Sequence, residues 1–384
     1  MPAEGTVHGS PSGTRPKPDE AGSACEDEET NLLVLNYTLQ CPLSCSFCCY
    51  GCRPGRTEKM PLGLALRLVD EAAVLGVFSS VGLTGGEPML FFDDLLQIGD
   101  RCKRGGIPFT VVTSGNWATS QEEADRRVSM LAARGLSRLS VSHDPSHARF
   151  VPRERVLNAV RAARSAGITT QVVGAFDSDG LDLAQYAPEL AAIPDIRLAT
   201  TKIARVGRGS SRPERNDGGS GRSSSSPLLC SRPWYLDLVV FYDGEVWPCC
   251  STFNLATPSL SIGNAHREGL KTLWQRANGS LMLRVMKREG FERLYEIVHD
   301  LDPETWAKLP TRIGDEDACS FCHRIFGNIP LASSLKAIFR VYERDRTLEA
   351  VDALTETIGC EATARLLEAF VTPGDSRPVR RPGT

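Results

Sequence analysis

The sequence predicts an α/β protein whose first half forms a parallel β-sheet and whose second half is a smaller unit. Three observations predict it. Apolar, strand-like runs alternate with amphipathic helical patterns six times between Asn31 and about residue 205. Polar motifs follow the first four strands, where parallel α/β folds place their sites. A Gly- and Ser-rich stretch at 206–228 then interrupts the alternation.

The alternating elements follow one another in a regular order. The predicted strands are rich in β-branched and aromatic residues and lie at 32–38, 79–84, 109–113, 138–142, 169–176 and 195–201. The first helix begins after Pro61 and ends at Gly76. Ser120 and Glu123 form a capping box for the third helix. This order fits either an open doubly wound sheet or a curved partial barrel.

The remaining segments differ in composition. Residues 1–30 are rich in Gly, Pro, Ser and acids, which predicts a disordered tail. We expect the flexible linker at 206–228 to separate the barrel-like domain, 31–205, from a second domain at 229–330. That domain opens with "YLDLVVFYDGEVWPCC", a hairpin pattern turning at Asp243-Gly244. Residues 331–384 are predicted to form C-terminal helices and a tail.

Charge and composition exclude several classes of protein. The net charge of -3 and the pI of about 6.1 argue against a protein that coats nucleic acid. The chain has neither an apolar run long enough to span a bilayer nor the apolar region of a secretory signal. We therefore expect a cytoplasmic protein with no membrane or nucleic-acid partner. Its 13 cysteines then indicate reduced thiols or metal ligands in place of disulfides.

The strongest motif is "CPLSCSFCCYGC" at 41–52, which follows the first strand. Its spacing Cys41-x3-Cys45-x2-Cys48 puts three thiolates on one loop, where they can hold three corners of an iron–sulfur cubane and leave one iron open. Zinc is the alternative, but structural zinc takes four ligands, usually as two pairs on two loops. The spacing therefore favours a cluster.

This loop resembles the CxxxCxΦC signature of the radical S-adenosylmethionine (SAM) enzymes, with Phe47 as the aromatic Φ. "GGEP" at 85–88 resembles the same family. The resemblance covers residues 31 to about 205 and implies a partial (β/α)6 TIM-like barrel. It implies a [4Fe–4S] cluster on Cys41, Cys45 and Cys48, with SAM chelated to the open iron. A reductant such as flavodoxin or ferredoxin would then drive formation of a 5′-deoxyadenosyl radical.

The resemblance also implies SAM contacts at the strand ends. The backbone of Gly85 and Gly86 and the carboxylate of Glu87 would meet the methionine amino group. Phe47 would lie beside the adenine. Three further candidates, which turns or caps explain equally well, are Ser114, Asn116 and Ser142.

A second set of four cysteines lies in the C-terminal half. Cys230, Cys249, Cys319 and Cys322 form a closed tetrathiolate set that fits zinc or iron–sulfur. The spacing Cys230-x13-Gly244-x4-Cys249 resembles the opening of SPASM/twitch extensions. Only Cys360 follows Cys322, so the resemblance implies one auxiliary [4Fe–4S] cluster, as in the twitch version. Cys49, Cys52 and Cys250 adjoin ligands and are candidate hydrogen donors, with packing as the alternative.

The sequence leads us to expect an enzyme that abstracts hydrogen from a C–H bond of a natural-product intermediate. We expect oxidation or epimerisation of a carbinol or amino carbon in a sugar-like metabolite. The alternative is a maturase that crosslinks, oxidises or epimerises a ribosomally made peptide. A third, non-enzymatic interpretation is a zinc-binding module on an α/β scaffold.

Overall fold

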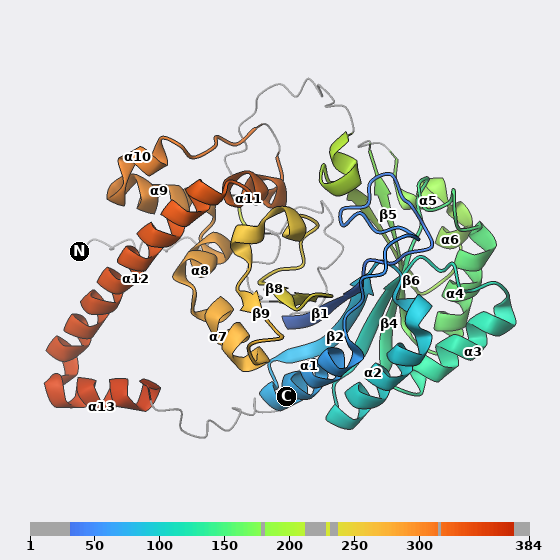
Figure 1. Ribbon diagram of the computed structural model, residues 1–384, viewed down its shortest axis with the longest axis horizontal. Helices are drawn as coiled ribbons and strands as arrows, with labels where there is room; N and C mark the ends of the chain where they lie inside the picture. Colours follow the sequence, from blue (N-terminus) through green and yellow to red (C-terminus); the bar gives the residue numbers. More distant parts are fainter. Residues whose placement is uncertain (1–30, 178–180, 212–227, 231–236, 314–315, 372–384) are drawn as a thin grey trace, which may run out of the picture.

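The computed structural model describes residues 31–177, 181–211, 228–230, 237–313 and 316–371 (Figure 1). The predicted tail at 1–30, with Cys25, lies outside these residues. So do most of the predicted linker, at 212–227, and the beginning of the predicted hairpin.

The backbone is organised around an open nine-stranded sheet in the order β6-β5-β4-β3-β2-β1-β7-β8-β9. Its first six strands pair in parallel through neighbouring registers. They are β1 (Asn31–Thr38), β2 (Phe78–Gly85), β3 (Phe109–Thr113), β4 (Leu136–Ser142), β5 (Thr169–Phe176) and β6 (Ile196–Lys202). The predicted α/β class with a parallel sheet is therefore confirmed, and the open sheet agrees with a partial barrel.

Helices between these strands cover one face of the sheet (Figure 1). They are α1 (Leu62–Leu75), η1 (Pro88–Phe91), α2 (Phe92–Gly105), α3 (Gln121–Ala132), α4 (Arg153–Ser165), α5 (Leu183–Tyr186) and α6 (Pro188–Ala191). The Ser120 hydroxyl accepts a hydrogen bond from the Glu123 amide at 3.2 Å, which is one half of the predicted capping box. The stretch between β5 and β6 forms two short helices, because Pro188, which lacks an N–H, begins a separate helix after α5.

The sheet has a core on each face. Along β1 the side chains alternate, so Leu33 and Leu35 pack against the helices between the strands, whereas Val34 joins a second core. The second core contains Phe241 and the apolar face of the C-terminal helices. The second core thus covers the other face of the sheet at β1 and β7, whereas Val112 of β3, on that same face, is 40% exposed.

The predicted hairpin is present, but it extends the main sheet. β7 (Leu238–Phe241) runs parallel to β1, with Leu33 opposite Leu238 and Asn36 opposite Phe241. β8 (Glu245–Trp247) and β9 (Gly263–Asn264) then pair antiparallel. Without β7, the edge of β1 would expose unpaired backbone donors and acceptors, so the second half of the chain completes the first.

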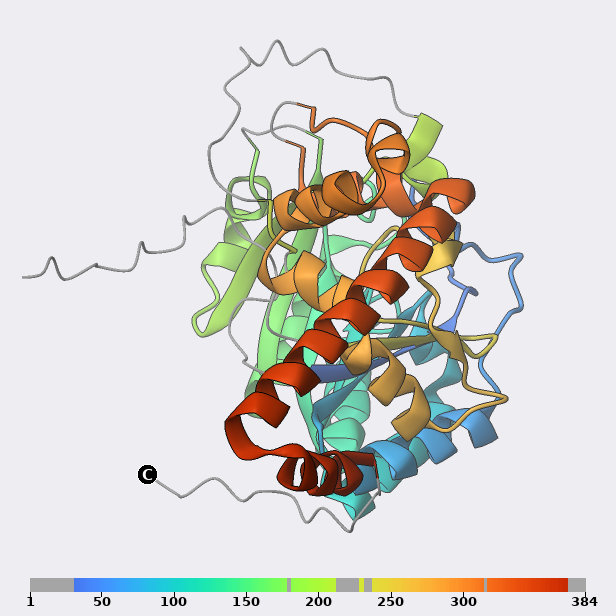
Figure 2. The ribbon, with the colours of Figure 1, turned by 90° about the vertical axis from the view of Figure 1, so that its left-hand side faces the viewer.

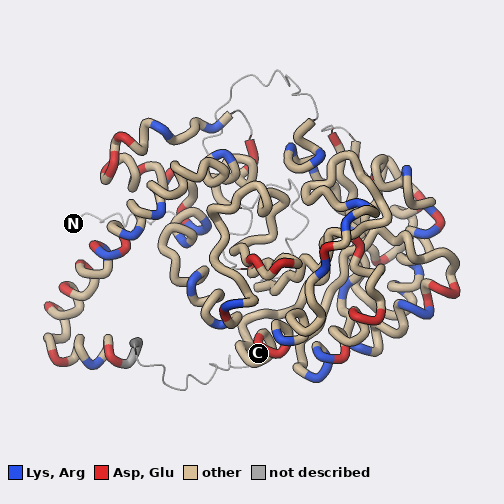
Figure 3. The backbone as a smooth tube through the Cα atoms, in the orientation of Figure 1, with Lys and Arg blue, Asp and Glu red and all other residues tan. Residues whose placement is uncertain are grey.

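The C-terminal helices divide between the two cores, because the helix at Leu270–Gly279 packs on the first core whereas most of the helices from Leu281 onwards pack on the second, and the long helix α12 crosses one side of the molecule (Figure 2). They are η3 (Asn254–Ala256), η4 (Pro258–Leu260), α7 (Leu270–Gly279), α8 (Leu281–Arg288), α9 (Phe291–Leu301), α10 (Pro303–Trp306), α11 (Ala318–Phe326), α12 (Ile329–Ile358) and α13 (Cys360–Val371). Over the described ranges, no helix combines the length and apolar character needed to cross a bilayer. Acidic and basic residues are interspersed along the helices (Figure 3).

Candidate active site

The cysteine loop lies over the carboxyl ends of the parallel strands and lines a pocket of about 340 Å³. All three predicted cluster ligands, Cys41, Cys45 and Cys48, contribute to this lining. The predicted residues that join them there are Phe47, Cys49, Cys52, Gly85, Gly86, Ser114 and Ser142. The ends of β5 and β6 also contribute, through Ala175 and Lys202. The structure thus brings most of the predicted site into one place.

Arg208 holds the cysteine loop from the far end of the sheet. It lies in η2 (Gly207–Ser211), a turn of 3-10 helix after β6. Its guanidinium donates hydrogen bonds to the carbonyl oxygens of Cys45 and Cys52, both at 2.8 Å. A side chain at Gly207 would come within 2.2 Å of the Cys49 carbonyl, so glycine permits this close approach. The first residues of the predicted flexible linker are therefore structured.

The cysteines of the loop differ in the pKa of their thiols. A hydrogen bond from the Cys52 thiol outweighs burial and lowers the pKa of Cys48 to about 5, and the Cys52 amide, 3.3 Å from the Cys48 sulfur, assists. Burial raises the pKa of Cys41 to about 12, and the charge of Glu87 adds to the increase. Cys48 is consequently favoured as a thiolate, the form that metals bind.

Two glycines at the end of β2 allow the loop to approach the sheet. Gly85 has φ +126°, and a Cβ there would come within 2.4 Å of the Thr38 carbonyl oxygen. A Cβ on Gly86 would come within 2.1 Å of the Gln40 carbonyl oxygen. The Gly86 amide donates to Thr38 at 2.6 Å and the Glu87 amide to Gln40 at 2.9 Å. Packing against β1 therefore requires these glycines, whatever binds in the pocket.

The side chain of Glu87 points into the protein. It is 2% exposed and accepts hydrogen bonds from the Ser114 amide and the Thr113 hydroxyl, both at 2.8 Å, and from the Met89 amide at 3.1 Å. Burial raises its pKa, and these hydrogen bonds oppose the increase. The carboxylate joins the ends of β2 and β3, and the expected contact with an amino group stays a prediction. Glu87 and Asn116 line a neighbouring pocket, and Asn116 binds Arg155 there.

The loop after β4 closes another side of the pocket. The Ser46 amide donates to the Ser146 hydroxyl at 3.1 Å, and the Phe47 ring lies edge-on to the His147 ring, 5.6 Å away. Asp144 accepts from Nδ1 of His147 at 2.7 Å. Burial lowers the pKa of His147, but hydrogen bonds to Asp144 and Cys45 outweigh it and raise the pKa to about 10. His147 was not among the predicted site residues, although the sequence shows it three residues after Asp144, in a polar loop at the end of a predicted strand.

The three candidate hydrogen donors lie in different surroundings. Cys49 is half-buried in the pocket lining. Cys52 is buried and hydrogen-bonded to Cys48, which raises its pKa. Cys250 is exposed and is not among the described residues that line the pocket. The same segment contributes Thr252 to the lining instead.

The second cysteine set comes from three separate segments. Cys230 lies before β7 in the chain, Cys249 follows β8, and Cys319 and Cys322 lie in α11. Burial raises the pKa of Cys249 and of Cys322, and the charges of Cys230 and Cys319 raise both further, so these thiols lie within electrostatic range of one another. The Asp317 carboxylate caps α11 by accepting from the Cys319 amide at 2.9 Å.

Lys287 lies beside this second set. It is 5% exposed, belongs to α8, and lowers the pKa of both Cys249 and Cys322 by its charge. A buried ammonium group is costly unless negative charge is close. Four thiolates holding a cluster would supply that charge.

Both sets offer thiol donors, the ligands typical of iron–sulfur clusters. Across the described residues, no three or more His, Cys, Asp or Glu side chains converge on one ion as they would in a mononuclear site. The residues present fit a cluster at each place, with three thiols around the first pocket and four at the second.

Comparison with known proteins agrees with this site. The sequence model of the radical SAM superfamily matches residues 35–177, and that of SPASM, an iron–sulfur cluster-binding domain, matches residues 230–294. A curated relative, "Putative peptide biosynthesis protein YydG" of Bacillus subtilis (strain 168), is 22% identical over 296 residues, which cover 77% of this chain and 91% of the relative.

Two solved structures resemble the fold more loosely. BtrN in complex with AdoMet and 2-DOIA has a TM-score of 0.42 at 17% identity and covers 69% of this chain and 89% of its own. Streptococcus suis SuiB bound to SAM has a TM-score of 0.38 at 16% identity, and the match covers 64% of this chain and 65% of SuiB. Both TM-scores lie below 0.5, so neither likeness decides the substrate.

The two matched domains contain the first cysteine set and half of the second, since Cys319 and Cys322 lie beyond the end of the second match. The first covers the loop with Cys41, Cys45 and Cys48, and the second begins at Cys230 and includes Cys249. The protein is therefore an enzyme of the radical SAM superfamily, with a SAM-binding [4Fe–4S] cluster and a SPASM domain that carries an auxiliary iron–sulfur cluster.

Proposed function

We propose that this enzyme matures a ribosomally synthesised peptide by radical chemistry at a C–H bond. The observation that carries the proposal is the similarity to the peptide biosynthesis protein YydG, which extends over 77% of this chain and 91% of that protein. The sequence alone led us to prefer a sugar-like metabolite. The similarity favours the peptide alternative instead.

In this proposal, Cys41, Cys45 and Cys48 hold the cluster and the pocket beneath them holds SAM. When bound and given one electron by a reductant, SAM supplies a 5′-deoxyadenosyl radical that takes a hydrogen atom, leaving methionine, 5′-deoxyadenosine and a substrate radical. The surrounding residues position the cofactor. Arg208 fixes the backbone of the cysteine loop, and the close packing of Gly85 and Gly86 on β1 keeps the loop against the strand ends.

Two outcomes of the reaction make different demands on the chain. Oxidation or crosslinking removes one further electron and a proton, and the auxiliary cluster would accept that electron. Epimerisation instead returns a hydrogen atom, for which a thiol is the natural donor. Cys49 is the best placed of the three candidates, because it lines the pocket whereas Cys250 is exposed and Cys52 is hydrogen-bonded to Cys48.

The test uses anaerobically reconstituted enzyme, SAM, dithionite and the short peptides encoded beside the gene. We expect one such peptide to be altered, with formation of 5′-deoxyadenosine. Loss of two hydrogens by mass spectrometry indicates oxidation or crosslinking, and uptake of one solvent deuterium without other mass change indicates epimerisation. If a carbinol or amino sugar is oxidised and none of the peptides changes, the peptide proposal is wrong.

A further inference from the structure

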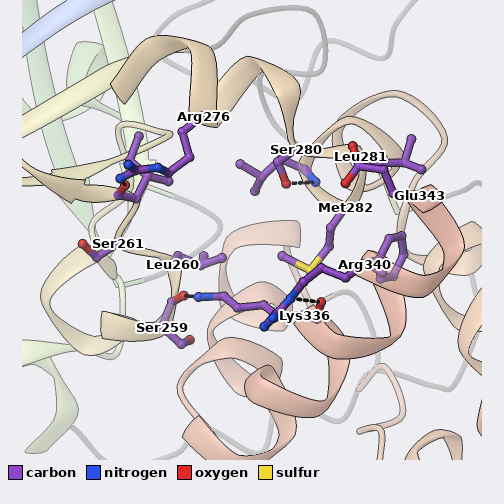
Figure 4. A pocket seen from close by; sticks show the side chains of 13 residues that line it. Ser259, Leu260, Ser261, Arg276, Ser280, Leu281, Met282, Lys336, Arg340 and Glu343 are labelled. Carbon is purple, nitrogen blue, oxygen red and sulfur yellow. Dashed lines mark hydrogen bonds between the residues drawn. The ribbon is translucent and has the colours of Figure 1, made fainter. Parts of the chain in front are cut away.

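A second pocket, of about 460 Å³, lies on the C-terminal half of the chain between η4, α8 and α12 (Figure 4). Its volume is within the range of ligand sites. It shares no lining residue with the cysteine pocket among the described residues. The segment after β8 links the two, because Thr252 lines the cysteine pocket and Ser259 lines this one.

Apolar and cationic side chains meet in this pocket. Leu281 and Met282, in the first turn of α8, and Phe339 of α12 belong to its lining, although Met282 and Phe339 are largely buried in the second core. Lys336 and Arg340 lie one turn apart on the same face of α12. Figure 4 shows Lys336 extending from α12 to the Ser259 carbonyl oxygen, to which it donates a hydrogen bond.

The charges of the pocket are unbalanced. Arg276, Lys336 and Arg340 contribute positive charge, and Glu343 is the one acidic residue of the lining among the described residues. Arg276 is already paired with Glu268. In the described part of the chain, neither Lys336 nor Arg340 forms an ion pair, and burial, followed by the charge of Arg340, lowers the pKa of Lys336.

An anion would relieve this imbalance. Lys336 and Arg340 repel each other, Glu343 offsets one of the two charges, and a further carboxylate between the cations would be stabilised by both. The amino end of α8, at Leu281, adds the positive end of a helix dipole to the same side. The partly exposed Ile262 and Leu281 of the lining favour aliphatic side chains next to that carboxylate.

We propose that this pocket binds an acidic, leucine-rich segment of the peptide substrate, at a distance from the residue that is modified. This inference rests on the proposed function, since it assigns a recognition site to the same substrate. A separate recognition site adds affinity that does not depend on the side chain presented to the cysteine pocket. One enzyme can then hold a peptide firmly while its reacting residue enters a small pocket.

The test measures fluorescence anisotropy of a fluorescein-labelled synthetic peptide that alternates glutamate and leucine, against the same peptide with glutamine in place of glutamate. We expect the wild-type enzyme to bind the acidic peptide about tenfold more tightly. Arg340→Glu should weaken binding of the acidic peptide by at least about tenfold, because it reverses the charge beside the expected carboxylate. The matched control is Arg344→Glu, one turn along α12, which should bind as the wild type does.

Equal binding of the acidic peptide by the wild type and Arg340→Glu would overturn the site, and so would a failure of the wild type to prefer the acidic peptide. Thermal unfolding of both variants checks that each is folded; Arg340 is exposed and its described bond is to the Lys336 carbonyl within α12. A change in oligomeric state in Arg340→Glu would mean that a second copy occupies the pocket, which also contradicts the proposal.

Failure of the proposed function is distinguishable from failure of this site. If Arg340→Glu loses the acidic peptide but the wild type modifies no peptide, the pocket stands and the maturase assignment falls. If the wild type modifies a peptide that Arg340→Glu binds equally well, the maturase assignment stands and the pocket is not its recognition site.

Discussion

The two cysteine sites of this protein are assembled in opposite ways. Cys41, Cys45 and Cys48 come from one short loop, so their spacing along the sequence is enough to predict a cluster site. Cys230, Cys249 and the pair on α11 are far apart in the sequence and could hold one cluster only once the second half of the chain folds. The first site can therefore be inferred from a motif, whereas the second depends on tertiary structure.

Each site also has a cation that acts directly on its cysteines, and the two cations are used differently. Arg208 is fixed by two hydrogen bonds to carbonyl oxygens of the cysteine loop, so it shapes the backbone as well as adding charge. Lys287 is buried, and it acts on the second thiol set through its positive charge, which lowers the pKa of Cys249. This difference predicts that loss of Arg208 changes the structure of the first site, and loss of Lys287 changes the electrostatics of the second.

The largest effect is expected when the first site loses its ligands. The triple variant Cys41→Ala, Cys45→Ala, Cys48→Ala should abolish reductive SAM cleavage, because no thiolates remain to hold the cluster that binds SAM. Iron analysis should give about four irons per chain, compared with about eight in the wild type. SAM cleavage that survived in this variant would show that the assignment of the first site is wrong.

The second site should separate cofactor chemistry from product formation. Cys319→Ala with Cys322→Ala should also reduce the iron content to about four per chain. The variant should still cleave SAM, and it should no longer release modified product if the auxiliary cluster accepts an electron from the substrate. The exposed Cys360→Ser in α13 is the control and should leave iron content and product unchanged. Full product formation by the double variant would exclude this electron-accepting role.

The same contrast explains what the sequence could predict. Alternating apolar runs identified β1 to β6, because the periodicity of a buried strand is local. The pairing of β7 with β1 was not predicted, since nothing in the hairpin pattern says which sheet edge it will cover. Arg208 was missed because its Gly- and Ser-rich surroundings are typical of a linker. The direction of the Glu87 carboxylate depends on Thr113 and Ser114 of a neighbouring strand end, which sequence cannot position.

The next prediction concerns Glu87 and the frame of the first site. Glu87→Gln should lower the free energy of unfolding by about 1–3 kcal/mol, because the amide turns a donor towards the N–H and O–H groups that the carboxylate accepts from. Denaturant unfolding measures it, and the exposed Glu122→Gln in α3 is the control. A normal unfolding free energy combined with a raised KM for SAM would instead support the predicted contact with the methionine amino group.

Arg208 should have a smaller effect, on the loop itself. Arg208→Gln removes the two hydrogen bonds to Cys45 and Cys52, so the first cluster should be lost more quickly on exposure to a chelator. Arg208→Lys keeps the positive charge but not the forked geometry of the guanidinium. The cluster of this variant should therefore have a reduction potential close to that of the wild type but should still be lost more quickly to the chelator. If both variants retain iron as the wild type does, Arg208 does not hold the loop.

Lys287 provides the smallest and most specific test. Lys287→Met keeps the length and apolar body of the side chain but removes a positive charge beside the second thiol set, and reduction adds negative charge to a cluster there. The reduction potential of the auxiliary cluster should therefore become more negative, by an amount on the order of tens of millivolts, while that of the SAM-binding cluster stays unchanged. Redox titration followed by electron paramagnetic resonance measures both potentials in one sample. Lys271→Met, at an exposed position in α7, is the matched control. If the reduction potential of the auxiliary cluster is unchanged in a variant that retains all its iron, the charge of Lys287 does not act on that cluster and the side chain serves only in packing. The two sites would then differ in how they are assembled but not in how a nearby cation affects them.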